Sequence, residues 1–359
     1  MSEGAELVIV DSYASCKEAI GRAEMCLSEG RRMIFLVPRP RLFEFLSRLD
    51  SPMVEVRALP TLDGASIKHP HSLCRMTVQL RAVRSVLKKL PPVERAYCFS
   101  IGFDLAPMMA VSYFSKRTNV FYSSYDGYFL EQEHYQLVHN LSSRAGAFLM
   151  SLLTRIPLVA CRPRRPILRL PDQFIKGRLN IVTASEREKV LEAWENGGLR
   201  NSVAQSSSAD VLWLYSDLPA YYDIDAKDAS NIERTWEGIV GHVTSVIPRA
   251  QHAVKSHPMD AGPLPACFHG MEELPREVPL EFFAFRQVRL VIGVPSQAML
   301  TFVPHPEISI ISLNRLFHLP RQAQEHQEEF LTEWLNVSGR IHSPSSFSEF
   351  ENIMSSLPK

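Results

Sequence analysis

Short apolar runs and amphipathic stretches alternate along the first half of the chain. The runs are rich in β-branched and aromatic residues, as buried strands are, and lie at residues 7–10, 33–37, 53–58, 96–100 and 119–122. Between them, apolar residues recur at helical spacing at 16–28, 41–49, 73–90 and 105–114. This alternation predicts a parallel sheet with helices on both faces.

The middle of the chain has a different texture. A helical pattern at 137–153 is followed by 157–171, where four prolines exclude a regular helix or a central strand. Another helix is expected at 186–194. The polar segment 201–209, with three consecutive serines, is typical of a linker.

The second half repeats the alternation. Strands are expected at 211–215, 252–255, 288–294 and 308–313, and helices at 232–246, 280–285 and 347–357. We therefore expect an α/β chain of two Rossmann-like domains, 1–205 and 206–359, facing each other across a cleft, with the last helix able to cross back to the first domain. Neither half carries a GxGxxG or Walker loop, which argues against a dehydrogenase or a P-loop ATPase.

Composition excludes several classes of protein. Lys+Arg and Asp+Glu both number 39 in 359 residues, so charge offers no argument for nucleic acid. The six cysteines are scattered without a CxxC pair, which favours reduced thiols over a structural zinc site. The first residues lack the pattern of a secretory signal, and no apolar run approaches the roughly 20 residues that span a bilayer. We expect a cytoplasmic protein without a metal centre.

Three polar segments follow expected strands, at the edge where open α/β sheets bind ligands. The first is Tyr125-Asp126-Gly127. A carboxylate on such a turn can take a proton from a hydroxyl group. Alternatively, Asp126 shapes the turn through its own backbone, which is a common role of Asp-Gly.

The other two segments lie in the second half. In Lys255-Ser256-His257-Pro258, the ammonium and imidazolium groups suit a phosphate, although a His-Pro pair at a strand end is commonly structural. Ser296-Gln297 follows the expected strand 288–294 and enters a helix. There Ser296 either caps the helix only or also offers its hydroxyl group and nearby N–H groups to an anion.

In their order, these motifs resemble those of the bacterial sialyltransferases and polysialyltransferases of the GT-B type. Those families carry an acidic pair followed by glycine in the first lobe. Their second lobe carries Lys-x-His-Pro, a glutamate and a serine pair. The corresponding residues here are Asp126-Gly127, Lys255, His257, Pro258, Glu281 and Ser296.

The resemblance implies an inverting, metal-independent glycosyltransferase without a cofactor. It would move a sialic-acid-like sugar from a CMP donor, held by the second domain, to a glycan acceptor on the side of the first. Asp126 would be the general base, and His257 would hold the CMP phosphate and assist its departure. Lys255, Pro258 and Glu281 would grip the nucleotide, the glutamate through ribose hydroxyl groups, and Ser296 would contact the leaving phosphate.

Two positions depart from the family pattern. Tyr125 replaces the first acidic residue, and Gln297 replaces the second hydroxyl residue, although its amide can still donate a hydrogen bond. These departures leave other CMP-linked sugar acids open as donors, namely legionaminic acid, pseudaminic acid and Kdo.

Further segments are candidates on position alone. Ser100 and Gly102 follow an expected strand and either border the acceptor or form a tight turn, and Tyr215-Ser216 could border the nucleotide. A basic segment could guide an anionic glycan or touch the anionic inner membrane, or could be a solvated loop; its cationic residues are Arg162, Arg164, Arg165, Arg169, Lys176 and Arg178.

Two other functions stay open. An epimerase of sugar nucleotides built on the same two-lobed scaffold would bind UDP and need an acid/base pair around one sugar carbon. A non-catalytic subunit of polysaccharide assembly would bind CMP without releasing it from any donor.

Overall fold

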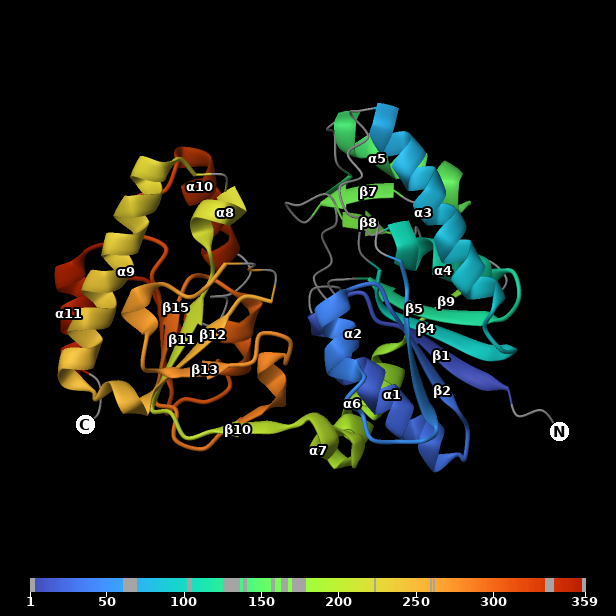
Figure 1. Ribbon diagram of the computed structural model, residues 1–359, viewed down its shortest axis with the longest axis horizontal. Helices are drawn as coiled ribbons and strands as arrows, with labels where there is room; N and C mark the ends of the chain where they lie inside the picture. The colour runs from blue at the N-terminus through green and yellow to red at the C-terminus, as the bar shows by residue number, and fades with distance from the viewer. Residues whose placement is uncertain are drawn as a thin grey trace. The chain divides into compact units, whose positions relative to one another are not determined.

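The computed structural model divides into two compact units, Met1–Val203 and Ala204–Lys359 (Figure 1). It describes residues 4–60, 70–101, 105–124, 136–137, 141–155, 159–162, 167–169, 179–222, 224–258, 260, 262–332 and 339–356. The division falls two residues before the boundary expected from the sequence. Each unit contains a six-stranded parallel sheet, so the expected α/β class with two Rossmann-like halves is confirmed.

The sheet of the first unit has the order β3-β2-β1-β4-β5-β9, the doubly wound Rossmann order. Its strands are β1 Ala5–Ile9, β2 Met33–Val37, β3 Val54–Ala58, β4 Val93–Ile101, β5 Asn119–Ser124 and β9 Leu179–Ile181. Its helices are α1 Cys16–Ser28, α2 Pro40–Leu46, α3 Pro70–Lys88, α4 Leu105–Ser115, α5 Leu141–Thr154, α6 Ala184–Asn196 and α7 Leu199–Val203. A small antiparallel sheet joins β6 Gln136–Leu137, β7 Val159–Arg162 and β8 Ile167–Arg169.

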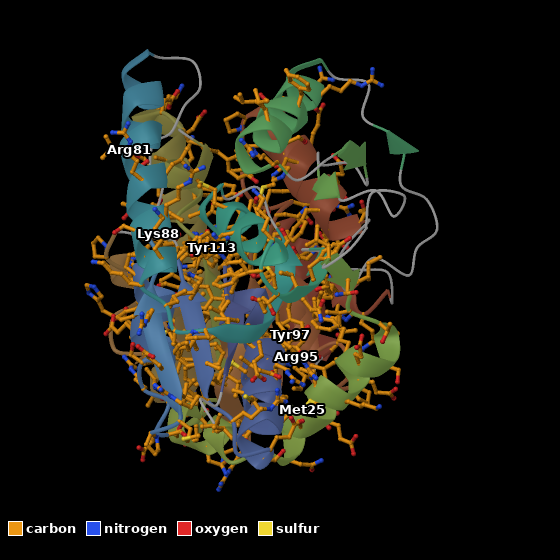
Figure 2. The ribbon with its side chains drawn as sticks, turned by 90° about the vertical axis from the view of Figure 1, so that its right-hand side faces the viewer. Met25, Arg81, Lys88, Arg95, Tyr97 and Tyr113 are labelled. Atoms are coloured by element: carbon orange, nitrogen blue, oxygen red, sulfur yellow. The ribbon has the colours of Figure 1, made fainter. Side chains whose placement is uncertain are left out.

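The two faces of this sheet are chemically different. One face packs Leu7 and Ile9 of β1 against apolar residues of α3 and α4. The other face carries Glu6, which is fully buried and receives hydrogen bonds from Arg22 of α1 and Arg31. Arg22 also lies over the ring of Tyr97 at 4.6 Å; Figure 2 labels Tyr97 and Arg95 on β4. The buried carboxylate is thus matched by guanidinium groups, as burial of a charge requires.

Helix α1 packs closely against α6. A Cβ atom at Gly21 would lie 2.0 Å from the carbonyl oxygen of Val190, so only glycine allows this approach. Arg187 of α6 adds an ion pair at 2.7 Å to Glu18, a buried residue of α1. The capping box of Thr183 and Glu186 begins α6 and explains where this helix starts.

The sheet of the second unit has the order β13-β12-β11-β15-β16-β17, again the Rossmann order. Its strands are β11 Val211–Tyr215, β12 His252–Ser256, β13 Glu272–Leu274, β15 Leu290–Gly293, β16 Ser309–Ser312 and β17 Ile341–His342. Its α-helices are α8 Leu218–Tyr222, α9 Ala226–Val246, α10 Arg321–Phe330 and α11 Phe347–Ser356. Short 3-10 helices are η3 Arg249–Gln251, η4 Ala266–Phe268, η5 Leu280–Phe282 and η6 Gln297–Thr301.

An aromatic cluster forms the core under α9. Trp213 of β11 contacts Trp236 and Phe268 with ring centroids 6.4 and 5.8 Å apart. Phe350 of α11 is fully buried in the same core, and α9 and α11 lie beside each other in Figure 1. The final helix therefore packs into the core of the second unit.

Two expectations about local structure are wrong. The helix expected at 280–285 is the single turn η5 followed by strand β14 Phe283–Phe285. The segment expected to be a linker contains the end of α7 and strand β10 Gln205–Ser207, which pairs in parallel with β14. Serine-rich sequence predicted a loop, but pairing with β14 satisfies the backbone of β10 and overrides that preference.

Replacing Gly21 with alanine should destabilise the first unit by more than about 2 kcal/mol, because the new methyl group overlaps a main-chain carbonyl that cannot move away alone. Urea unfolding followed by circular dichroism measures this change. Gly146 in α5 is the matched control: a Cβ there meets nothing within 4 Å, so Gly146→Ala should be neutral or slightly stabilising. Equal stability of the two variants would contradict the close packing of α1 on α6.

Candidate functional site

Strand β11 lies at the centre of the second sheet and brings two of the predicted motifs to one edge. It pairs in parallel with β12 on one side and with β15 on the other, so the carboxyl ends of all three strands are neighbours. Tyr215 ends β11, His257 follows β12, and Ser296 follows β15. The chain reverses its direction of winding between β11 and β15, which is the position where open α/β sheets bind ligands.

The main chain of His257 is held against β11. Its N–H donates to the carbonyl oxygen of Tyr215 at 2.9 Å and to the carboxylate of Asp260 at 3.2 Å. The side chain of His257 is half-buried. The structure therefore holds the main chains of His257 and Tyr215 together at the carboxyl edge of the sheet.

Lys255 is buried, with 6% of its surface exposed. Its ammonium group donates to the carbonyl oxygens of Ser256 at 3.3 Å and Arg276 at 3.0 Å. These contacts tie the end of β12 to the loop that follows β13. A buried ammonium needs such acceptors, and this geometry gives Lys255 a structural task beside its predicted contact with the nucleotide.

Two charged residues at this edge escaped the sequence analysis. The Asp260 carboxyl is buried, and desolvation raises its pKa to about 6. Arg276 donates to the main-chain oxygens of Asp260 at 3.3 Å and Gly262 at 2.7 Å. Asp260 lies three positions after His257, so its spacing was a usable signal. Arg276 comes close only through the pairing of β12 with β13.

Tyr215 is half-buried. Its ring lies 5.7 Å from that of Trp236 and 5.5 Å from that of Phe268. Burial, and then the nearby carboxylates of Asp217 and Asp260, raise the pKa of its phenol. Tyr215 therefore stays a neutral hydrogen-bonding group, and Ser216 beside it is half-buried at the start of the loop.

The segment after β15 differs from the expected helix. Ser296 caps η6, a 3-10 helix of five residues, through a hydrogen bond from the N–H of Ala298 at 3.2 Å. Gln297 is the first residue of η6, and η5, which carries Glu281, packs against it. So short a helix has a weak dipole, and the proposed anion site must depend on individual donors instead.

The predicted residues of the first unit are only partly described. Ser100 lies near the end of β4, whereas Gly102, Asp126 and Gly127 lie outside the described residues. At the neighbouring end of β1, the buried side chains of Asp11 and Ser12 occupy the equivalent switch position between β1 and β4. Asp11 was not predicted as a site residue, although a carboxylate directly after an apolar run was a visible signal.

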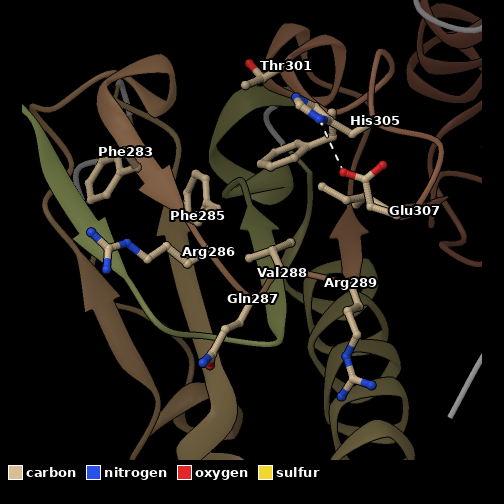
Figure 3. Close-up of a pocket in the computed structure, with 11 residues that line it drawn as sticks. Phe283, Phe285, Arg286, Gln287, Val288, Arg289, Thr301, His305 and Glu307 are labelled. Atoms are coloured by element: carbon tan, nitrogen blue, oxygen red, sulfur yellow. Dashed lines mark ion pairs between the residues drawn. The ribbon is translucent and has the colours of Figure 1, made fainter.

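A cavity of about 530 Å³ lies elsewhere in the second unit. Figure 3 shows Phe283 and Phe285 on one side and the His305–Glu307 ion pair, 3.4 Å long, on the other. Its lining includes Arg289 and Ile308, which directly precede β15 and β16. The cavity therefore lies at the amino ends of these strands, at the sheet edge opposite His257. None of the predicted site residues lines this cavity, so its size alone does not locate the site.

Among the described residues, no helix combines the length and the apolar character needed to cross a membrane. In the same part of the chain, no three His, Cys, Asp or Glu side chains gather as metal ligands would.

No protein-family model matches the chain, and no curated protein matches it. Among solved structures, it is similar to the calicheamicin glycosyltransferase CalG4, at 10% identity and a TM-score of 0.42 over 99% of this chain and 90% of that one. It is also similar to a putative UDP-N-acetylglucosamine 2-epimerase from Listeria monocytogenes (10%, 0.43, 99% and 88%) and to MurG from Acinetobacter baumannii (10%, 0.37, 98% and 91%). The strand orders of the two sheets define the fold of each unit independently of these similarities.

A second histidine of β12, His252, is structural. Its Nδ1 accepts from the Trp213 indole at 3.0 Å, and its Nε2 lies 3.1 Å from the carbonyl oxygen of Ile247, so the ring is neutral with the proton on Nε2. Burial lowers its pKa to about 4. His252 therefore stabilises the fold above its unfolded pKa of about 6.5, and this contribution is lost as the pH falls toward 4.

Replacing His252 with glutamine should remove this dependence. On going from pH 7 to pH 4.5, the unfolding free energy of the variant should fall by about 2 kcal/mol less than that of wild type. Urea unfolding at both pH values measures the difference. Comparison with wild type at each pH is needed because the raised pKa of Asp260 gives a slope of opposite sign. His342→Gln, at an exposed position, is the control, and an equal difference there would refute the assignment.

Proposed function

We propose that the chain is a GT-B glycosyltransferase that transfers a sialic-acid-like 2-keto sugar acid from its CMP donor to a glycan acceptor. The observation that carries this proposal is the position of the Lys255–His257 motif. It lies at the carboxyl edge of β12, hydrogen-bonded to the end of β11, beside the switch point of a Rossmann sheet. A cationic side chain at such an edge suits a nucleotide phosphate.

The reaction assigns one role to each candidate. Asp126 takes the proton from the acceptor hydroxyl, whose oxygen forms the new bond to the anomeric carbon. The bond from that carbon to the phosphate oxygen breaks, and CMP leaves with the electron pair. His257 stabilises the charge that develops on the departing phosphate, with Ser296 and Gln297 as further donors. A single displacement of this kind inverts the anomeric configuration and requires no metal ion.

The other residues at this edge of the second sheet contact the CMP-linked sugar in this proposal. The half-buried Tyr215 and Ser216 border the nucleotide, Glu281 accepts from ribose hydroxyl groups, and Pro258 stiffens the loop after His257. On the acceptor side, Ser100 and Gly102 border the sugar, and Gly127 lets it approach the backbone beside Asp126. The donor is sialic acid or a related CMP-linked acid such as legionaminic acid, pseudaminic acid or Kdo.

A nucleotide panel tests the donor class. CMP at 100 times its dissociation constant should add about 2.7 kcal/mol to the stability of the folded protein, whereas UDP and GDP at equal concentration should add little. Thermal-shift measurements read this directly. Preference for UDP would favour an epimerase of sugar nucleotides. CMP binding without CMP release from any of the four donors would favour a non-catalytic subunit of polysaccharide assembly.

Two substitutions separate catalysis from donor binding. Asp126→Asn should lower turnover by about two to four decades and leave CMP affinity unchanged, because the base acts on the acceptor. His257→Asn should weaken CMP binding as well as turnover. Asp50→Asn, at an exposed position of the first unit, is the control. Full turnover in the Asp126 variant would remove that residue from the mechanism.

The protein also associates with an anionic membrane in this proposal. The basic segment that begins at Arg162 lies mainly outside the described residues, but α5 precedes it in the chain and contacts β7. On α5, Phe148 and Leu152 are 71% and 66% exposed, one helical turn apart. Exposed Arg144 and Arg155 lie before and after them in the sequence. Apolar side chains flanked by arginines suit the surface of an anionic bilayer.

Vesicle co-sedimentation tests this contact. Phe148→Ser with Leu152→Ser should weaken binding to phosphatidylglycerol vesicles about tenfold or more, since two large apolar side chains no longer enter the lipid. Val246→Ser, which alters an equally exposed apolar residue of the second unit, should bind as wild type does. Binding unchanged in the double variant would exclude α5 from the contact.

A further inference from the structure

One buried carboxylate joins two of the loops at the donor edge. The carboxylate of Asp260 accepts from the main-chain N–H of His257 at 3.2 Å, and the N–H of Asp260 donates back to the carbonyl oxygen of His257 at 3.0 Å. The same carboxylate accepts from the main-chain N–H of Asp217, in the loop after β11. Asp260 therefore holds the loop after β12 to the loop after β11.

A third loop is attached through Arg276. Its guanidinium donates to the carbonyl oxygens of Asp260 and Gly262, and its own carbonyl oxygen accepts from the ammonium group of Lys255. The loops that follow β11, β12 and β13 thus form one hydrogen-bonded group with Asp260 at its centre. Asp260 is only 8% exposed, so water competes little for these bonds.

We propose that Asp260 is a positioning residue of the donor site: its ionised carboxylate fixes the main chain of His257 and Asp217 so that the imidazole of His257 is presented to the phosphate of CMP. This inference rests on the proposed function. Asp260 does not need to touch the nucleotide. It acts through the backbone of a residue that does.

The ionisation state of Asp260 controls this clamp. An ionised carboxylate accepts bonds at both oxygens, whereas a protonated one turns one oxygen into a donor and leaves one N–H without its acceptor. Burial raises the pKa of Asp260 to about 6. The hydrogen bonds from the main-chain N–H groups of Asp217 and His257 oppose this shift, as Arg276 does more weakly, and the Asp217 carboxylate adds to it. Tyr215, Lys255 and His257 are the other titratable groups at this edge. As the pH falls through about 6, the clamp loosens and CMP affinity falls.

Protonation of His257 acts in the opposite direction, because a cationic imidazole binds phosphate more tightly. A pH profile of the wild-type protein therefore mixes the two effects. The ratio of dissociation constants between an Asp260 variant and wild type cancels the contribution of His257, since both proteins carry it.

Asp260→Asn keeps the size of the side chain and one acceptor oxygen but cannot ionise. We expect its dissociation constant for CMP to be about tenfold that of wild type at pH 8, the loss of one charge-assisted hydrogen bond. The ratio should approach one at pH 5, where the wild-type carboxyl is protonated. Titration calorimetry with CMP across this range measures it. Glu273→Gln removes an exposed carboxylate that pairs with the same Arg276 at 3.4 Å, and its ratio should stay near one.

Two results would overturn the proposal. A ratio of one at pH 8 means that the carboxylate does not position the site, and a ratio equally raised at every pH means a structural role without ionisation. If wild type binds no CMP, the proposed function fails, and amide hydrogen exchange of wild type still tests the clamp. Protection of the amides of Asp217, His257 and Asp260, corrected for intrinsic exchange, should fall from pH 8 to pH 5. Constant protection would exclude the clamp.

Discussion

Parallel pairing of β11 with both β12 and β15 is the constraint on which the second unit depends. It brings three strand ends together, so that residues more than forty positions apart in the chain share one edge. The approach of β15 to β11 requires a residue without a side chain: a Cβ at Gly293 would lie 2.3 Å from the carbonyl oxygen of Leu214. Gly293 is therefore required for the packing of β15 against β11, and this packing fixes where the segment after β15 begins.

Hydrogen bonds to main-chain atoms stabilise the buried charges at the carboxyl edge of the second sheet. The ammonium of Lys255 is held by carbonyl oxygens, and the carboxylate of Asp260 is held by N–H groups. In the first unit, by contrast, Glu6 is matched by the side chains of Arg22 and Arg31. A hydrogen bond to the main chain restricts where a loop can lie, because it holds the backbone itself and not only a flexible side chain. The hydrogen bonds at the carboxyl edge of the second sheet thus fix the positions of loops, whereas the arginines around Glu6 balance a charge buried under a helix.

The two histidines of the β12 segment show how environment divides residues of one type. His252 begins the strand inside the aromatic core, where desolvation and the indole of Trp213 keep it neutral. His257 leaves the strand at the opposite end, half-buried and hydrogen-bonded through its backbone. Residue type and local sequence do not predict which histidine is buried. The position of each one relative to β12 decides it, because one end of the strand lies in the core and the other at the edge of the sheet.

The sequence by itself determined the class of the fold and most of its elements. Strands such as β2 and β11 and helices such as α1 were predicted with their observed bounds, because each has a local hydrophobic period. The Lys255–His257 motif was also visible, since its chemistry lies within four consecutive residues. Asp260 was within reach of the same local argument.

Tertiary structure decided the rest. Segment 201–209 became part of a sheet only because β14 supplies a partner strand, and 280–285 divided into a turn and a strand for the same reason. Arg276 reached the carboxyl edge of the second sheet, beside Asp260, through the pairing of β12 with β13. Local patterns report how a residue prefers to orient its own backbone and side chain. Which distant carbonyl or carboxylate it meets depends on strand order, and strand order is a property of the whole sheet.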